Sequence, residues 1–114
     1  MKINIKDFTA TALSEDAGIL LRQHIKVALS QAAVVELDFE GISLFSTTFF
    51  NASIGFFVLQ LGPDKCKEIF KPTHISELGQ DTYDHSLENA EIIFRREYAI
   101  DDIGTITKRN IEGA

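Results

Sequence analysis

Three consecutive hydroxyl residues, Ser46, Thr47 and Thr48, stand immediately before a mostly apolar run at 49–61. A hydroxyl at this position can cap a helix by accepting a hydrogen bond from a backbone N–H group. An exposed hydroxyl can instead carry a phosphoryl group, which adds roughly −1.5 to −2 charge. The residue types favour capping, and the two roles are compatible because one residue can cap while another is exposed.

Carboxylates recur at alternate positions in Glu36, Asp38 and Glu40, so an extended strand would place neighbouring pairs on one side. Such a pair can perform acid–base chemistry only in a pocket that separates the two pKa values. Alternatively, Asp38 supports the turn at Gly41 by accepting hydrogen bonds from backbone N–H groups. We favour this supporting role. The alternative is a ligand-sensing or catalytic domain that uses Asp38 with the hydroxyl of Ser46 or Thr47.

Metal, nucleotide and nucleophile motifs do not stand out in this chain. The histidines, His24, His74 and His85, lack metal-ligand spacing, and Cys66 is the single cysteine. The glycines form neither of the common phosphate-binding patterns. We therefore expect no catalytic residues, no metal and no cofactor.

The excess of acidic over basic residues argues against nucleic acids and anionic membranes as partners. The 114 residues carry 11 basic and 17 acidic side chains, for a formal net charge of −6. A nucleic-acid binder normally presents a basic patch, and an anionic membrane attracts basic segments. We expect neither nucleic-acid nor membrane binding. The start of the chain has no apolar signal-peptide segment, which favours a cytoplasmic location.

The hydrophobic pattern alternates between strands and helices. Period-two and β-branched segments predict strands at 2–8, 33–39 and 68–76. Helical spacing predicts helices at 15–31, 49–61 and 79–98, with Ser14 capping the first and Gly62-Pro63 ending the second. This β-α-β-α-β-α order predicts a small α/β sandwich: a mixed sheet with a parallel centre and helices packed on it. We expect one domain over 1–99 and a flexible C-terminal tail over 100–114.

Phenylalanine is unusually frequent around the second predicted helix. Five of the nine phenylalanines fall between positions 45 and 57. Apolar residues cover most of that helix, so more than its sheet-facing side should be buried. A second copy of the chain is one candidate for covering the surplus, which leaves a homodimer or a homo-oligomeric structural module open.

The segment Val34–Gly55 resembles the core motif of the STAS-like family, a group of small bacterial domains of unknown function. The resemblance rests on the run Val35-Glu36-Leu37-Asp38-Phe39-Glu40-Gly41 and on Thr47-Thr48-Phe49-Phe50-Asn51, with Gly55 four residues further on. Wider relatives are the STAS domains of anti-sigma-factor antagonists, which a histidine-kinase-like ATPase phosphorylates in an Asp-Ser-Ser-Gly motif. By this resemblance Thr47 takes the place of the phosphorylated serine, Thr48 that of the second serine, and Ser46 and Phe49 replace the outer two residues.

The resemblance implies a non-enzymatic module for protein interaction in partner-switching signalling. Its switch would lie at Ser46–Thr48, and its partner would be a histidine-kinase-like ATPase or a regulator. The partner would dock on the loop 42–48 and the exposed side of the helix that follows. We assign partner binding to Ser43, Phe50 and Asn51, and support of the loop to Asp38 and Gly41.

Overall fold

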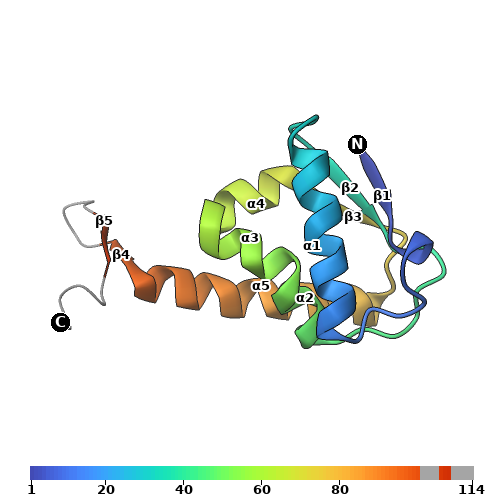
Figure 1. The fold of residues 1–114 in the computed structure, drawn as a ribbon. Coiled ribbons are helices and arrows are strands. Elements are labelled where there is room, and N and C mark those ends of the chain that lie inside the picture. Colours follow the sequence, from blue (N-terminus) through green and yellow to red (C-terminus); the bar gives the residue numbers. More distant parts are fainter. Residues whose placement is uncertain (101–105, 109–114) are drawn as a thin grey trace.

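The computed structural model describes residues 1–100 and 106–108. A three-stranded sheet is formed by β1 (Lys2–Asn4), β2 (Val35–Asp38) and β3 (Phe70–Thr73). The helices are α1 (Glu15–Leu29), α2 (Thr47–Ala52), α3 (Ile54–Leu61), α4 (Pro63–Ile69) and α5 (Glu77–Glu97), and a short 3₁₀ turn, η1 (Ile5–Asp7), follows β1. Figure 1 shows the sheet at one end of the molecule, with α5 running away from it.

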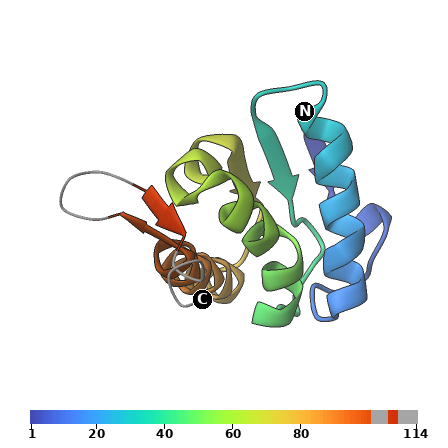
Figure 2. The ribbon, with the colours of Figure 1, turned by 60° about the vertical axis from the view of Figure 1, so that its left-hand side comes forward.

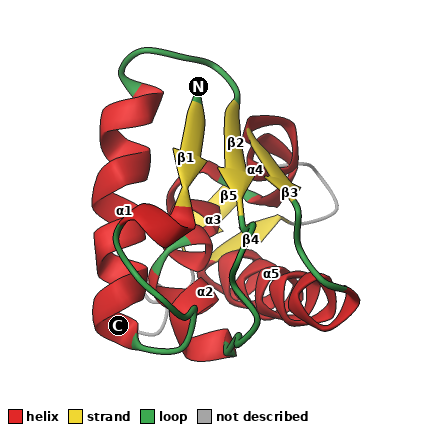
Figure 3. Ribbon diagram, turned by 90° about the vertical axis from the view of Figure 1, so that its right-hand side faces the viewer, coloured by secondary structure: helices red, strands yellow, loops and turns green. Residues whose placement is uncertain are grey.

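The sheet is parallel throughout, with β2 between β1 and β3. The prediction of a mixed sheet is therefore corrected, while the parallel centre is confirmed. Its pleat sends the buried apolar side chains towards the helices, namely Ile3, Val35, Leu37 and Phe70. The opposite face carries two polar rows across the strands: Lys2, Glu36 and Lys71, then Asn4, Asp38 and Thr73. Figure 3 looks onto this face, where the strands lie in front of the helices. A parallel sheet is normally covered on both faces, so this open polar face sets the domain apart.

The expected sequence of six alternating elements is not what the structure has. Three helices separate β2 from β3, where the sequence predicts one. Gly62 ends α3 as predicted, with a φ of 90°. However, the following Pro63 starts α4, because proline suits the first turn of a helix. The strand expected at 68–76 is therefore only Phe70–Thr73, and Pro72 does lie on an edge strand.

The predicted helix 49–61 is broken at Ser53. The Ser53 backbone has φ −106° and ψ −85°, and its hydroxyl donates to the Phe49 carbonyl at 2.9 Å. Arg22 of α1 donates from Nε to the Ala52 carbonyl at 2.8 Å, a carbonyl that a continuous helix would use internally. A side chain from another element thus takes over one helical acceptor, and α3 leaves in a new direction.

The phenylalanine cluster is mostly core. Phe39, Phe49 and Phe50 are fully buried, and Phe45 packs against them from the loop before α2. Edge-to-face contacts join Phe50 to Phe49 and to Tyr83 of α5, with centroids 5.2 and 5.3 Å apart. Figure 2 places α2 between α1 and α5. These neighbours within the chain cover most of the apolar surplus.

The C-terminal segment contains a further pair of strands. Strands β4 (Tyr98–Ile100) and β5 (Ile106–Lys108) pair antiparallel after α5. The rest of the segment expected to be a flexible tail, 101–105 and 109–114, lies outside the described residues, so that expectation stays a prediction.

Candidate functional site

The hydroxyl loop, which we define as residues 42–48, is fixed in place by Ser46. The Ser46 hydroxyl accepts a hydrogen bond from the Phe49 N–H group at 3.2 Å, so it is the N-cap of α2. The same hydroxyl donates to the Leu13 carbonyl at 2.6 Å. The capping role expected within the triplet is therefore confirmed, and it belongs to Ser46.

The hydroxyls of Thr47 and Thr48 do not cap α2. Thr47 is half-buried and Thr48 is exposed, at the first two positions of α2. Neither hydroxyl makes a hydrogen bond to any of the residues that the structure describes. The structure thus leaves two hydroxyl groups without partners directly beside the cap.

A second segment of the chain supports the hydroxyl loop. The Ala12 N–H group donates to the Leu44 carbonyl at 2.9 Å, and the Ser46 N–H group donates to the Ala12 carbonyl at 2.8 Å. These bonds place Leu13 next to the loop that contains Leu44, and the two residues are 40% and 52% exposed. Leu13 was not predicted to take part in this surface, whereas Leu44 lies within the predicted docking loop 42–48 but was not singled out. Each of them is a single apolar residue in a predicted loop, and no burial was expected at either position.

The three residues assigned to partner binding lie in different surroundings. Ser43 and Asn51 are exposed, and the Asn51 side-chain oxygen accepts a hydrogen bond from Ser86. Phe50 is 0% exposed and lies in the core between Phe39 and Tyr83. The assignment of Phe50 to a partner surface is therefore corrected, because no partner reaches this ring in the folded domain.

Asp38 supports the turn at the end of β2, as expected. Its Oδ1 atom accepts from the Glu40 N–H group at 2.9 Å, and Gly41 follows with a φ of 84° that favours glycine. Oδ1 also meets His74 Nδ1 at 3.0 Å, while Oδ2 pairs with Lys2 Nζ at 3.1 Å. The hydrogen bond from the Glu40 backbone, helped by Lys2 and His74, lowers the Asp38 pKa to about 2.

Asp38 and the hydroxyl triplet do not act on a common atom. The contacts of Asp38 go to Lys2, Glu40 and His74, and those of Ser46 go to Leu13 and Phe49. Within the described part of the chain, no hydrogen bond links the two groups. A lowered pKa also makes the Asp38 carboxylate a weaker base. The geometry therefore gives no support to a catalytic pair of Asp38 with Ser46 or Thr47.

Titratable side chains gather around Asp38 in a way that the sequence did not predict. Ligand atoms of Asp38, Glu40 and His74 all lie within 4.8 Å of one another. His74 follows β3 directly, with a left-handed φ of 50°.

The single cysteine is not a candidate nucleophile. Cys66 is buried, and burial raises the pKa of its thiol to about 11, which keeps it protonated and unreactive.

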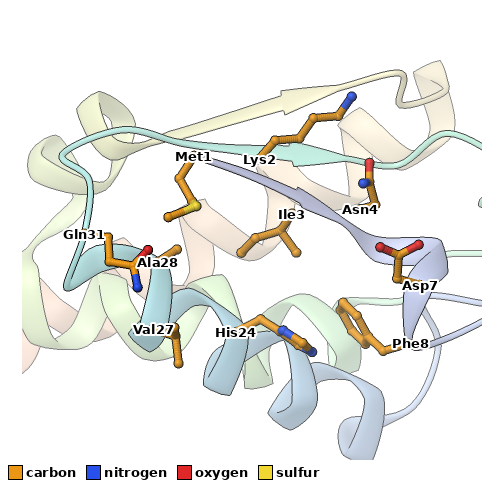
Figure 4. A pocket seen from close by; sticks show the side chains of 10 residues that line it. All are labelled: Met1, Lys2, Ile3, Asn4, Asp7, Phe8, His24, Val27, Ala28 and Gln31. Atoms are coloured by element: carbon orange, nitrogen blue, oxygen red, sulfur yellow. The ribbon is translucent and has the colours of Figure 1, made fainter.

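A separate hollow of about 300 Å³ lies between β1 and α1 (Figure 4). Ile3 and Ala28 contribute apolar surface to it, and the His24 ring stacks on Phe8 with centroids 4.5 Å apart. None of the predicted site residues lines this hollow. We therefore do not assign it to the candidate site.

The fold and the loop define a class: a small α/β domain whose hydroxyl loop precedes a helix on the covered side of a parallel sheet. The family model described as "STAS-like domain of unknown function (DUF4325)" matches residues 17–80. The chain belongs to this family. The match includes α1, β2, the hydroxyl loop and β3.

Neither a curated protein nor a solved structure matches the chain significantly. Among the described helices, none combines the length and the apolar character needed to cross a membrane.

Proposed function

We propose that this chain is a non-enzymatic, STAS-like regulatory module that binds a protein partner through the hydroxyl loop. The observation that carries the proposal is the exposed Thr48 in the same loop as the exposed Leu44, both within the part of the chain that the family model matches. The exposed Leu13 is tied to this loop by the hydrogen bond from the Ser46 hydroxyl to its carbonyl. Covering these leucines with a partner favours binding by roughly 25 cal/mol for each Å² of apolar surface removed from water. Ser43 lies next to Leu44 and completes the contact surface.

Phosphorylation of Thr47 or Thr48 is the proposed switch. A phosphoryl group there would add a charge of roughly −1.5 to −2 to the loop that carries Leu44. A partner that covers the leucines would then have to remove water from this charge, which weakens binding. Thr48 is the more accessible acceptor, whereas Thr47 matches the position that the family resemblance indicates.

Site-specific photo-crosslinking tests the contact surface. We would place a photoreactive amino acid at Ser43 in one variant and at Ser30 in a matched control, because both positions are exposed. Ser30 follows α1, outside the hydroxyl loop. Crosslinking of one defined protein from Ser43 but not from Ser30 supports the proposal. Equal products from both positions contradict it.

The switch is tested by incubating the chain and ATP with any histidine-kinase-like ATPase that is encoded beside its gene. We expect one phosphoryl group per chain, located by mass spectrometry at Thr47 or Thr48. Thr47→Ala and Thr48→Ala separate the two acceptors, and Thr82→Ala on α5 is the control. Phosphorylation that persists in the double variant Thr47→Ala/Thr48→Ala would rule out this switch while leaving the docking surface to the crosslinking test.

A further inference from the structure

We propose that Asp38, Glu40 and His74 bind a divalent transition-metal ion, with Zn²⁺ as the best match. The site lies at the carboxyl ends of β2 and β3, on the open polar face of the sheet. Ligands commonly bind at this edge of a parallel sheet. The inference does not depend on the proposed protein-binding function.

The spacing of the three side chains suits one ion. His74 Nδ1 lies 3.0 Å from Asp38 Oδ1 and 4.0 Å from Glu40 Oε2. Ligand atoms at about 2.1 Å from a tetrahedral zinc ion are roughly 3.4 Å apart. These two separations lie on either side of this value, and the ligand atoms of Asp38 and Glu40 also lie within 4.8 Å of each other. Coordination by all three therefore requires rotation of the exposed His74 and Glu40 side chains towards the ion.

The donor set indicates which ions the site prefers. One imidazole nitrogen with two carboxylates is a set that zinc and other first-row ions accept, whereas Mg²⁺ and Ca²⁺ prefer oxygen ligands alone. Asp38 is only 4% exposed and is held by the Glu40 N–H group, so one ligand is already fixed. On binding, the hydrogen bond between Asp38 and His74 gives way to the metal, and the neutral imidazole carries its proton on Nε2.

The Lys2 ammonium group competes with the metal ion for the Asp38 carboxylate. This group lies 3.1 Å from Asp38 Oδ2, while the ion would use Oδ1. The two cations can therefore share the carboxylate, but their repulsion weakens the site. Removing the charge at Lys2 should tighten metal binding, an effect that chance binding to a surface histidine would not show.

The test is calorimetric titration of the chelator-treated full chain with Zn²⁺, and with Mg²⁺ as comparator. We expect one Zn²⁺ per chain and no measurable Mg²⁺ binding. His74→Asn and Glu40→Gln should each weaken Zn²⁺ binding at least about tenfold, and Lys2→Gln should strengthen it. Asparagine is chosen at His74 because it tolerates the left-handed backbone. His85→Gln is the matched control, since His85 is an exposed histidine on α5.

Three results would overturn the proposal. They are no Zn²⁺ binding by the wild-type chain, equal weakening by His74→Asn and His85→Gln, and binding that Glu40→Gln leaves unchanged. Binding found only in Lys2→Gln also overturns it, because the ammonium group then excludes the ion from the native site. Circular dichroism of each variant confirms that the change in binding does not come from unfolding.

Discussion

At the scale of single residues, Ser46 holds the hydroxyl loop through two hydrogen bonds from one oxygen. It caps α2 through the Phe49 N–H group and reaches Leu13 on a different segment. We predict that Ser46→Ala lowers the free energy of unfolding by about 1–2 kcal/mol, the usual cost of losing an N-cap. Urea unfolding measures this difference.

Thr48→Ala is the matched control for Ser46→Ala. The Thr48 hydroxyl is exposed and has no hydrogen-bond partner among the described residues. Its removal should change the free energy of unfolding by less than about 0.5 kcal/mol. Equal losses from both variants would show that Ser46 does not anchor the loop.

The same residues show how far sequence patterns reach at this scale. Hydroxyls before an apolar run predict a cap, and an aspartate before glycine predicts a supported turn, because both depend on neighbours within a few residues. Ser46 and Asp38 confirm this. The burial of Phe50 and the approach of His74 to Asp38 depend on residues more than 30 positions away. Local periodicity does not contain that information.

At the scale of elements, α1 and α2 pack so closely that a side chain is excluded between them. A Cβ atom on Gly18 of α1 would lie 2.5 Å from the Phe49 carbonyl oxygen and 2.8 Å from the Ala52 Cβ. We predict that Gly18→Ala costs about 1–3 kcal/mol of stability, because one of the helices must move. Thermal or urea unfolding measures the cost.

Gly55→Ala on α3 is the control for the helix contact. Its added Cβ would meet the Phe50 carbonyl oxygen at 3.4 Å and the Ala90 Cβ at 3.9 Å, which needs at most a small adjustment. Alanine also favours a helix over glycine by up to about 1 kcal/mol. We therefore expect Gly55→Ala to be neutral or stabilising. A similar loss at both positions would mean that the α1–α2 contact is not unusually tight.

Element order was less predictable than element type. The α1 helix with its Ser14 cap and the central strand β2 follow from strong local patterns. The break between α2 and α3 does not, since one of its hydrogen bonds comes from Arg22 of α1, 30 positions away from Ala52. Pro63 follows the end of α3 and is also the first residue of α4, because proline both stops a helix and suits the first turn of the next one.

At the scale of the whole molecule, the helices cover one face of the parallel sheet and leave the other polar. Alternation along Lys2–Asn4 indicates this one-sided burial. In β2, Glu36 and Asp38 lie in the polar rows of the same face, although Asp38 itself is buried. The metal-site proposal uses the open face, whereas the hydroxyl loop joins α2, which packs between α1 and α5. Among the described residues, no hydrogen bond or ion pair joins Asp38, Glu40 or His74 to the hydroxyl triplet, so variants of one group serve as controls for the other.

The covered side of the sheet gives the molecule a predictable response to alkali. Cys66 and Tyr83 are buried there at 2% and 4% exposure, and burial raises the pKa of both side chains, that of Cys66 to about 11. An unfolded thiol ionises near its ordinary pKa of about 8.5. Below that pH the thiol is neutral in both states and its contribution to stability is fully present. Between about pH 8.5 and 11 the unfolded state loses the proton first, so the folded state loses stability.

We therefore predict that the free energy of unfolding falls above about pH 9 through Cys66 and, above about pH 10, also through Tyr83, at up to about 1.4 kcal/mol per pH unit for each group. Urea unfolding at intervals from pH 7.5 to 10.5 measures the slope. Cys66→Ala creates a small cavity and should lower stability at every pH, but its alkaline slope should be shallower than that of the wild type. Tyr83→Phe removes the other ionisation and should also reduce the slope. If Cys66→Ala kept the wild-type slope, the thiol would have to ionise as readily inside the fold as outside it, contrary to its burial.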